Sequence, residues 1–360
     1  MFARRIASLI SLTALLILPA ALVIGCGGVV SPGIITETPR SDPSNKGYLF
    51  CFWNTENFFD DKLDNYHNHP DKEFDGWFAN NPKVLKQKVE NLSRVLAELN
   101  DGMGPDILAL AELESERSAE LLADALNARI KNPELHYKHI LMKEPKGFGR
   151  NIGTAIITRL PVIRDKTRLH GKRQRILEGH VEVNGDDLVI LATHWTSRVT
   201  DEIGDSRDRY ADQIYGVYRG MFMSNPKVDF LVCGDFNDPP DDDSVVKHLH
   251  GVGDRARVRK SDRDQPLLYN LFLDKNDGKH GTHFYSGKWE VFDQILVSPD
   301  MLGDGHWTCD TESARIVDSL TADRKGRPKH FGNEHDKIEL SERGCSDHFP
   351  VMVRLHVADK

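Results

Sequence analysis

The stretch Gly234-Asp235-Phe236-Asn237-Asp238 points most directly to the fold of this chain of 360 residues. It follows the apolar run 228–233, and a short apolar run bounded by turn-forming residues predicts a buried β-strand. Asp235 and Asn237 therefore fall where a strand ends. Because strand ends that meet at one rim of a sheet are where sites form in α/β proteins, we expect both side chains to face a cleft.

A similar arrangement recurs along the chain, where polar side chains directly follow or precede an apolar run. These side chains are Asn54, Glu112, His194, Asp347 and His348. Carboxylate and amide oxygens are the ligands that hard cations such as Mg²⁺ prefer. A bound cation neutralises a phosphoester, and an imidazole can remove a proton from water near neutral pH. The pattern therefore predicts metal-assisted hydrolysis of phosphoesters.

Strand and helix signals alternate between these sites. Helices are expected from Asn81-Pro82 onward, over 118–130 and over 206–223, from apolar residues spaced three and four apart. Strands are expected at 48–53, 107–110, 137–142, 153–158, 176–183, 188–193, 228–233, 291–297 and 349–355. The alternation predicts a mixed α/β sandwich. The polar stretch 303–346 is expected to be a long surface excursion, and 67–71 is interpreted as a polar loop rather than a metal site.

Composition sets the limits of this interpretation. The chain is 39% hydrophobic and carries a net charge of −8, so it can bury a sizeable core, and it is not a strongly basic nucleic-acid binder. Contact with a polyanion would have to come from a local patch. The runs 255–260 and 172–175 are two basic candidates, although such runs are more often simply solvated.

The first residues are expected to be a targeting segment. Arg4 and Arg5 precede an apolar run that ends at Gly25-Cys26, which resembles the lipobox of bacterial lipoproteins. We expect a signal peptide at residues 1–25, a lipid on Cys26, a flexible tether over 26–46 and the catalytic domain over 47–360. An uncleaved membrane anchor is the alternative. Both interpretations place the domain outside the cytoplasm. The preferred one has it lipid-anchored to a bacterial membrane, or secreted.

Four further cysteines remain. Cys51 and Cys233 lie in apolar runs and are expected to be buried thiols, whereas Cys309 and Cys345 flank a polar segment and could pair in an oxidising compartment. The chain has no CxxC motif and no cluster of Cys and His, which argues against a structural zinc site.

Six motifs, in the same order along the chain, resemble the endonuclease/exonuclease/phosphatase superfamily. They are Trp53-Asn54, Glu112, Thr193-His194, Gly234-Asp235-Phe236-Asn237, Phe292-Asp293-Gln294 and Ser346-Asp347-His348. Deoxyribonuclease I, exonuclease III and the neutral sphingomyelinases belong to this superfamily. The resemblance extends from about residue 47 to 357. It implies a four-layer α/β sandwich, in which two mixed β-sheets are flanked by helices.

The resemblance also implies a metal site. Glu112 is expected to be the principal ligand, with Asn54 beside it, and Asp347 is expected to help hold the cation. The implied cofactor is Mg²⁺ or Mn²⁺.

Catalytic roles follow from the same resemblance. His348 is expected to be the general base, with Asp293 orienting it and raising its basicity. Asp235 and Asn237 are expected to hold the attacking water and a phosphate oxygen. His194 is the expected second imidazole, which contacts the phosphate or protonates the leaving oxygen.

Three further residues are assigned with less support from the motifs. Glu144 is expected to orient His194, and Arg150 and Arg198 are candidate phosphate clamps, because a guanidinium binds phosphate through two bonds. For Glu144 and Arg150, an ordinary structural role is an equally good interpretation.

The substrate stays open between alternatives. An extracytoplasmic nuclease or phosphodiesterase is preferred, with nucleic acid favoured over phospholipid because of the two basic runs. A sphingomyelinase-like or phospholipase C-like enzyme is the alternative, since the chain is expected to be tethered to a membrane. A non-catalytic surface binding protein is a third hypothesis, which the complete set of acids and imidazoles disfavours. No protein partner is inferred.

Overall fold

The structure, a computed structural model, describes residues 47–144, 149–171, 175–303 and 305–358. The expected signal peptide at 1–25 and the expected tether over 26–46, including Cys26, lie outside the described residues. Within the described ranges, no helix is both long enough and apolar enough to cross a membrane.

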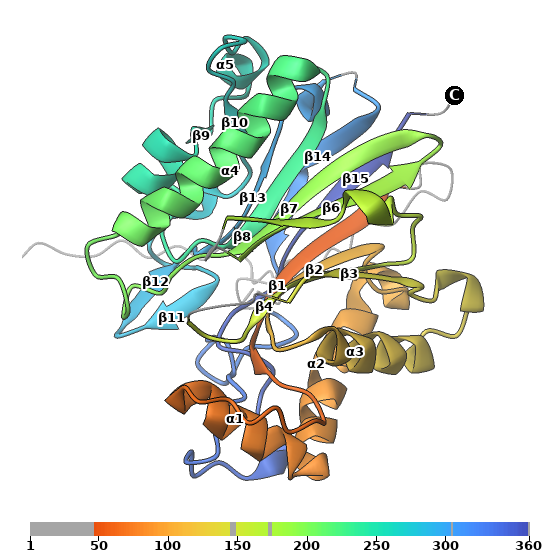
Figure 1. Ribbon diagram of the computed structural model, residues 1–360, viewed down its shortest axis with the longest axis vertical. Helices are drawn as coiled ribbons and strands as arrows, with labels where there is room; N and C mark the ends of the chain where they lie inside the picture. The colour runs from red at the N-terminus through yellow and green to blue at the C-terminus, as the bar shows by residue number, and fades with distance from the viewer. Residues whose placement is uncertain (1–46, 145–148, 172–174, 304, 359–360) are drawn as a thin grey trace, which may run out of the picture. The chain divides into compact units, whose positions relative to one another are not determined.

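Two mixed β-sheets and one separate hairpin contain the strands (Figure 1). The first sheet has the order β14-β15-β1-β2-β4-β3, and the second has the order β5-β6-β7-β8-β13-β10-β9. The strands are β1 Tyr48–Phe58, β2 Ile107–Leu113, β3 His139–Met142, β4 Gly153–Thr158, β5 Arg168–His170, β6 Arg175–Val183, β7 Asp186–His194, β8 Asp229–Asp235, β9 Gly251–Val252, β10 Leu268–Asn270, β11 His283–Tyr285, β12 Lys288–Glu290, β13 Asp293–Val297, β14 Trp307–Ile316 and β15 Val351–Val357.

Three apolar clusters hold four layers together. Side chains of β1 and β2 such as Phe52 and Ala109 meet side chains of β7 and β8 such as Ile190 and Leu231 between the two sheets. Three helices cover the face of the first sheet that points away from the second sheet, and their apolar side chains pack in one cluster with those of the sheet. They are α1 His69–Ala79, α2 Pro82–Gly102 and α3 Glu116–Arg129. The helix α4 Asp205–Ser224 packs on the outer face of the second sheet, and the short α5 Arg255–Arg259 contacts β10. The expected four-layer α/β sandwich is confirmed.

The periodicity of the sequence located most elements to within a few residues. The helix expected from Asn81-Pro82 is α2, and the helices expected over 118–130 and 206–223 are α3 and α4. Leu85, Leu92 and Leu96 of the expected apolar stripe are buried in the core. Pro82 occupies the first turn of α2, where a missing backbone N–H has no cost.

Two expectations about polar segments are wrong. The polar stretch 303–346 is not simply a surface excursion, because it supplies β14 to the first sheet and places Phe331 fully in the core. The loop expected at 67–71 leads instead into α1, where the Asn68 side chain accepts a hydrogen bond from Asp71 N as a helix cap. Both segments are mostly polar, so their apolar anchors gave too weak a periodic signal.

The four cysteines within the described residues are buried free thiols. Cys309 lies in the apolar cluster between the two sheets, whereas Cys345 lies in the cluster between the first sheet and helices α1 to α3. The disulfide that the sequence left open between these two residues is therefore not formed.

Candidate active site

One half of the site follows from strand register in the second sheet, and we call it the strand half. His194 at the end of β7 pairs with Asp235 at the end of β8, which in turn pairs with Asp293 at the start of β13. Gly234 permits this close approach, because an added Cβ would lie 2.4 Å from Thr193 O. Three adjacent strands therefore deliver two carboxylates and an imidazole to one level of the sheet.

The other half, which we call the bulge half, depends on irregular backbone in the first sheet. It consists of Asn54, Asn57 and Glu112, at the ends of β1 and β2, where the pairing of the two strands shifts its register. Glu112 has φ of 63° and Asn57 has φ of 52°, in the left-handed region that side chains with a Cβ rarely adopt. Such backbone commonly occurs at functional sites, and here Asn57 N donates to Glu112 Oε2 at 2.8 Å.

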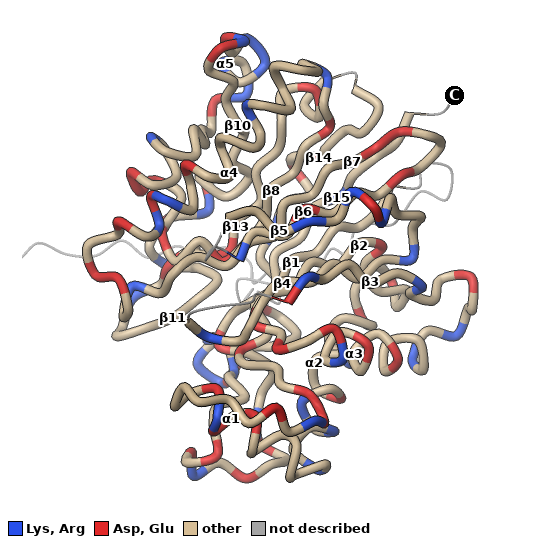
Figure 2. Tube along the Cα trace, viewed as in Figure 1, with Lys and Arg blue, Asp and Glu red and all other residues tan. Residues whose placement is uncertain are grey.

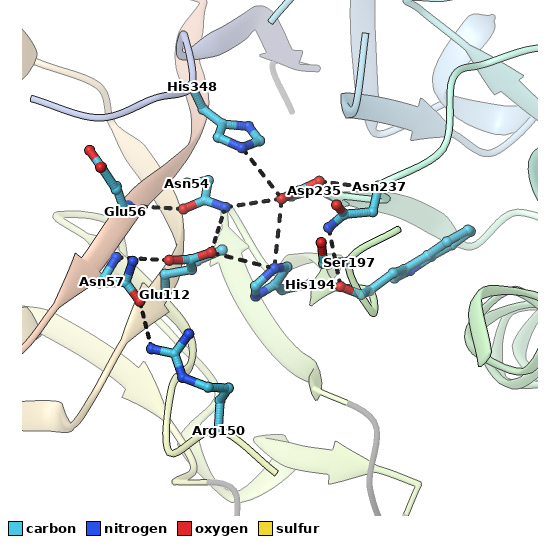
Figure 3. Close-up of polar contacts among 12 residues, drawn as sticks. Asn54, Glu56, Asn57, Glu112, Arg150, His194, Ser197, Asp235, Asn237 and His348 are labelled. Carbon is cyan, nitrogen blue, oxygen red and sulfur yellow. Dashed lines mark hydrogen bonds and ion pairs between the residues drawn. The ribbon is translucent and has the colours of Figure 1, made fainter. Parts of the chain in front are cut away.

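Asn54 joins the two halves, as Figure 3 shows. Its Nδ2 donates to Glu112 Oε1 at 3.2 Å and to Asp235 Oδ2 at 3.0 Å. His194 Nε2 lies 3.6 Å from the same Glu112 oxygen and 3.7 Å from the same Asp235 oxygen. The two carboxylates therefore converge on one small volume between the sheets, although they come from separate sheets.

His348 is fixed on both sides. Its Nδ1 donates to Asp293 Oδ2 at 2.7 Å, while its Nε2 lies 3.8 Å from Asp235 Oδ2. Trp53 Nε1 donates to the carbonyl oxygen of His348 at 2.8 Å, which ties this residue to β1. A carboxylate on Nδ1 sets the tautomer that leaves Nε2 directed into the cleft. This is the arrangement that a general base oriented by Asp293 requires.

The imidazoles of the cleft have opposite pKa shifts. Burial alone would lower the pKa of His348, but the charges of Asp293 and Asp235 raise it well above its usual value. Burial lowers the pKa of His194, against the charges of Glu112 and Asp235. Burial and the neighbouring charge of His348 lower the pKa of His283 to about 4. At neutral pH, His194 and His283 are therefore neutral rings beside a strongly basic His348.

The donor set fits a hard divalent cation beside Glu112. Two carboxylates, the buried Asp235 and the mostly buried Glu112, face the same point, and their shared negative charge suits a hard divalent cation. Burial raises the pKa of Asp235, as expected for an acid without a full counter-charge. The Asn54 amide turns its nitrogen toward both acids, and its Oδ1 accepts from Glu56 N at 2.9 Å. Its oxygen reaches a cation only after the amide rotates.

Asp347 lies apart from this pair. It is about half exposed, and its Oδ2 approaches His283 Nε2 at 4.0 Å. Asp347, His283 and His348 present ligand atoms within 4.8 Å of one another, so Asp347 faces the cleft from the side of His348. Among the described residues, it has no direct contact with Glu112 or Asn54, and its role in holding the cation stays a prediction.

The two expected phosphate clamps differ in position. Arg198 lines the cleft, and its guanidinium donates to Asp238 Oδ1 at 2.8 Å and to the carbonyl oxygen of Asn237 at 2.9 Å. Arg150 is bound instead to Asp71, and its Nη2 donates to Asn57 Oδ1 at 2.6 Å. Arg150 therefore supports the bulge half and is not part of the cavity lining.

Glu144 does not orient His194 in this geometry. Glu144 is exposed at the end of β3, and His194 Nδ1 is buried with no hydrogen-bond partner among the described residues. The expectation came from the family resemblance at a position with little motif support, and a resemblance in sequence does not say where a side chain points.

The cleft has a volume of about 680 Å³ and contains most of the predicted set. Its lining includes Glu112, His194, Arg198, Asp235, Asn237, Asp347 and His348. Asn237 lies against the floor, where its N donates to Asp235 Oδ1 at 2.9 Å and its Nδ2 donates to Trp195 O at 3.2 Å. This packing fixes Asp235 from below.

Two residues beside the cleft were missed from the sequence. His283 on β11 lines the cleft and lies with its ring 4.6 Å from that of His348. Lys88 of α2 is fully buried behind the site, where its Nζ donates to Glu56 O at 3.0 Å and to Cys345 O at 2.8 Å. A lone histidine in a polar stretch and a lysine in a helix give no signal of such roles.

Comparisons with known proteins identify the family of the chain. A profile of the Endonuclease/Exonuclease/phosphatase family matches residues 49–357. No significant match exists among curated protein sequences. TDP2 of D. rerio, in a complex with a single-strand DNA product, has 15% identity and a TM-score of 0.52, over 87% of this chain and 100% of that chain.

Two other solved structures are similar at the same level. The mannosyl-6-phosphatase Bt3783 of Bacteroides thetaiotaomicron has 15% identity and a TM-score of 0.51, over 86% of this chain and 99% of its own. Sphingomyelinase C of Streptomyces griseocarneus has 13% identity and a TM-score of 0.52, over 86% and 99%. At these identities the likeness shows the fold, while the match to the family profile over 49–357 shows the family. The chain belongs to the endonuclease/exonuclease/phosphatase family of phosphoester hydrolases, which use divalent metal ions.

Proposed function

We propose that this protein is a phosphodiesterase that cleaves by in-line attack of water, with His348 as the general base. The observation that carries the proposal is the placement of His348 Nε2 in the cleft, 3.8 Å from Asp235, while Asp293 holds Nδ1 at 2.7 Å. A base must lie within reach of the water that it deprotonates, and this geometry provides that position. A divalent cation at Glu112 would neutralise the phosphate.

The remaining residues complete the proposed mechanism. Asp235 and Asn237 position the attacking water near His348 Nε2. His194, on the other side of Asp235, is neutral and therefore suits a hydrogen bond to a phosphate oxygen. Protonation of the leaving oxygen, the other expected role, would need its imidazolium form, which burial disfavours. The strongly raised pKa of His348 belongs to the metal-free cleft, and a cation beside Glu112 opposes that rise because positive charge disfavours an imidazolium.

A nucleic-acid strand is the preferred substrate, but not because of the two basic runs. The run 255–260 includes α5, which packs against β10 away from the cleft lining, and Figure 2 shows its Lys and Arg residues far from β11. Residues 172–174 of the other run lie outside the described residues. The preference depends instead on the aromatic residues that line the cleft, which are His283, Tyr285 and Phe292.

A phospholipid is the second candidate. Val199, which lines the cleft, is 84% exposed, and Ile203, which follows the cleft residue Glu202, is 87% exposed. Apolar side chains at the mouth of a cleft are suited to a lipid surface. The lipobox-like residues before Cys26 support an extracytoplasmic, lipid-anchored location in this proposal.

Turnover by the purified full-length chain tests the proposal. Single-stranded DNA, RNA, plasmid DNA, sphingomyelin and bis(p-nitrophenyl) phosphate are each incubated with Mg²⁺, Mn²⁺ or EDTA. We expect metal-dependent cleavage of nucleic acid and of the small diester, with loss of both in Glu112→Ala. Cleavage of sphingomyelin alone would select the second candidate. No turnover with any metal would favour a binding protein on the same fold.

A further inference from the structure

The mouth of the cleft has an unusual concentration of exposed apolar surface. Among the described residues, the three most exposed large hydrophobic side chains are Ile203, Val199 and Tyr285, at 87%, 84% and 64%. Val199 and Tyr285 both line the cleft, and Ile203 follows Glu202, which also lines it. Exposed apolar surface gathered at one place on a soluble domain marks a binding site.

A series of neighbouring aromatic rings extends from His348, the candidate base, to Tyr285. The ring of His283 lies 4.6 Å from that of His348 and 6.2 Å from that of Tyr285, measured between centroids. The His283 and Tyr285 rings are inclined by only 20°, and Phe292 stacks on His283 at 5.5 Å and 22°. Tyr285 is thus the most exposed ring of a series that begins at His348, whose ring is inclined by 33° to that of His283.

The hairpin that carries Tyr285 is held firmly. Phe284 points to the opposite face, where it packs on Trp289 at 5.0 Å, and Trp289 packs on Phe349 at 6.1 Å. Phe349 directly follows His348 in the chain, and its N donates to Thr282 O at 2.7 Å. Because side chains alternate across a strand, this packing places His283 and Tyr285 together on the cleft side.

The charges at the rim favour stacking over electrostatic attraction. The cleft lining has two cationic residues, Lys288 and Arg198, against five acidic ones, so it carries no excess of positive charge. The guanidinium of Arg198 is already bound to Asp238. A rim without excess positive charge gives little affinity for a long phosphate backbone, so the group beyond the phosphate must be bound mainly through its flat face.

We propose that Tyr285 is a stacking platform for the nucleobase next to the scissile phosphate, which rests on the phosphodiesterase function proposed above. A base can stack on Tyr285 only when it has left a duplex, so the inferred substrate class is single-stranded or frayed nucleic acid. A flexible acyl chain gains little from parallel rings, whereas the flat face of a purine or pyrimidine can stack on Tyr285 as one further ring.

Two substrates with the same leaving group isolate the base. Thymidine 5′-(p-nitrophenyl phosphate) and methyl p-nitrophenyl phosphate both release p-nitrophenol from a diester, and only the first carries a nucleobase. In the full-length metal-loaded enzyme, the ratio of their kcat/KM values measures the contribution of the base. We expect this ratio to fall by about 5- to 150-fold in Tyr285→Ala and to be retained in Tyr285→Phe and Tyr285→Trp.

Tyr215→Ala is the matched control. Tyr215 lies on α4, outside the cleft lining, where its ring stacks on His250 at 4.0 Å. We expect the ratio to stay at the wild-type value in this variant. An unchanged ratio in Tyr285→Ala, or an equal fall in Tyr215→Ala, would overturn the proposal.

Strand preference and salt provide a second measurement. Wild-type enzyme should cleave a single-stranded oligonucleotide with higher kcat/KM than the same sequence in a duplex, with a shallow dependence on salt. A preference for the duplex, or for sphingomyelin vesicles that Tyr285→Ala abolishes, would contradict the nucleobase. If wild type cleaves neither small diester, the phosphodiesterase function fails first. Calorimetric titration with thymidine 5′-monophosphate then decides the stacking site separately, because loss of binding in Tyr285→Ala supports it and equal binding rejects it.

Discussion

The strand half and the bulge half of the site are built in opposite ways. His194, Asp235 and Asp293 occupy paired positions on adjacent strands, so regular hydrogen bonding alone brings them level. Glu112 and Asn57 instead have left-handed backbone at a shift in strand pairing, and their geometry is maintained by contacts from other segments. The difference shows that a regular sheet can position catalytic groups by itself, whereas an irregular turn needs support from behind.

His348 belongs to neither half and contacts both. Its side chain is held by Asp293 of the strand half, and its carbonyl oxygen accepts from Trp53, next to Asn54 of the bulge half. Ser346 Oγ also donates to Asn54 O at 2.7 Å. The loop before β15 therefore sets the distance between the base and the two acids.

The largest expected effect comes from removing the imidazole of His348, the proposed general base. His348→Ala should lower kcat/KM by about 10²- to 10⁴-fold, which is the range that general bases contribute. The thermal midpoint should change little by comparison. Phosphodiester turnover and thermal unfolding check this, with the exposed His248→Ala as the matched histidine control. A variant that keeps full activity would remove His348 from the mechanism.

Asp293→Asn tests the strand half by itself. Because Asp293 raises the pKa of His348, its loss should lower that pKa toward the usual value for histidine. Activity should fall by about 10- to 100-fold, as for other groups that orient a reacting residue. NMR titration of the His348 ring in the metal-free protein measures the pKa. An unshifted pKa would show that Asp235 alone controls the imidazole.

Lys88→Met tests the support behind the bulge half. The substitution leaves the carbonyl oxygens of Glu56 and Cys345 without their buried donor, which should cost about 1–3 kcal/mol of unfolding free energy. Activity should fall less than in His348→Ala, because no group that touches the substrate is lost. Chemical denaturation measures the change, and the exposed Lys86→Met on the same helix is the control. Equal stability of both variants would mean that the bulge half keeps its geometry without the hydrogen bonds of Lys88.

The smallest effect is expected at Glu178, on β6 and outside both halves. Burial opposes its ionisation, but His170 at 2.6 Å and His180 at 3.1 Å lower its pKa to about 2 from 4.5. Since the folded-state pKa is the lower one, its stabilisation is complete above about pH 4.5 and disappears as the pH falls toward 2.

Glu178→Gln should accordingly lower the thermal midpoint by about 2–4 °C at pH 6, and the difference from wild type should shrink toward pH 3. Activity at neutral pH should be unchanged. Thermal scans across this range check the sign, with the exposed Glu182→Gln on the same strand as control. A difference that grows on acidification would mean that Glu178 is not the ionised partner of these histidines.

Local patterns in the sequence predicted much of the fold. Apolar runs and helix periodicity gave nine strands and three long helices near their observed bounds, because burial imposes periods that are visible in a linear chain. The stretch 303–346 failed this test. Its strand β14 alternates charged and apolar residues at a sheet edge, and Phe331 is buried without apolar neighbours in sequence.

The sequence by itself determined the set of reacting groups, since motifs that end strands carry their own acids and imidazoles. Only the tertiary structure decided their partners. It placed Asn54 between Glu112 and Asp235, assigned Arg150 to Asn57 and left Glu144 exposed. It also brought His283 and Tyr285 to the cleft and Lys88 behind it. The physical reason is distance along the chain. Strand ends are set by local burial and backbone pairing, whereas contacts across two sheets and a hairpin depend on how the layers pack, which no short stretch of residues encodes.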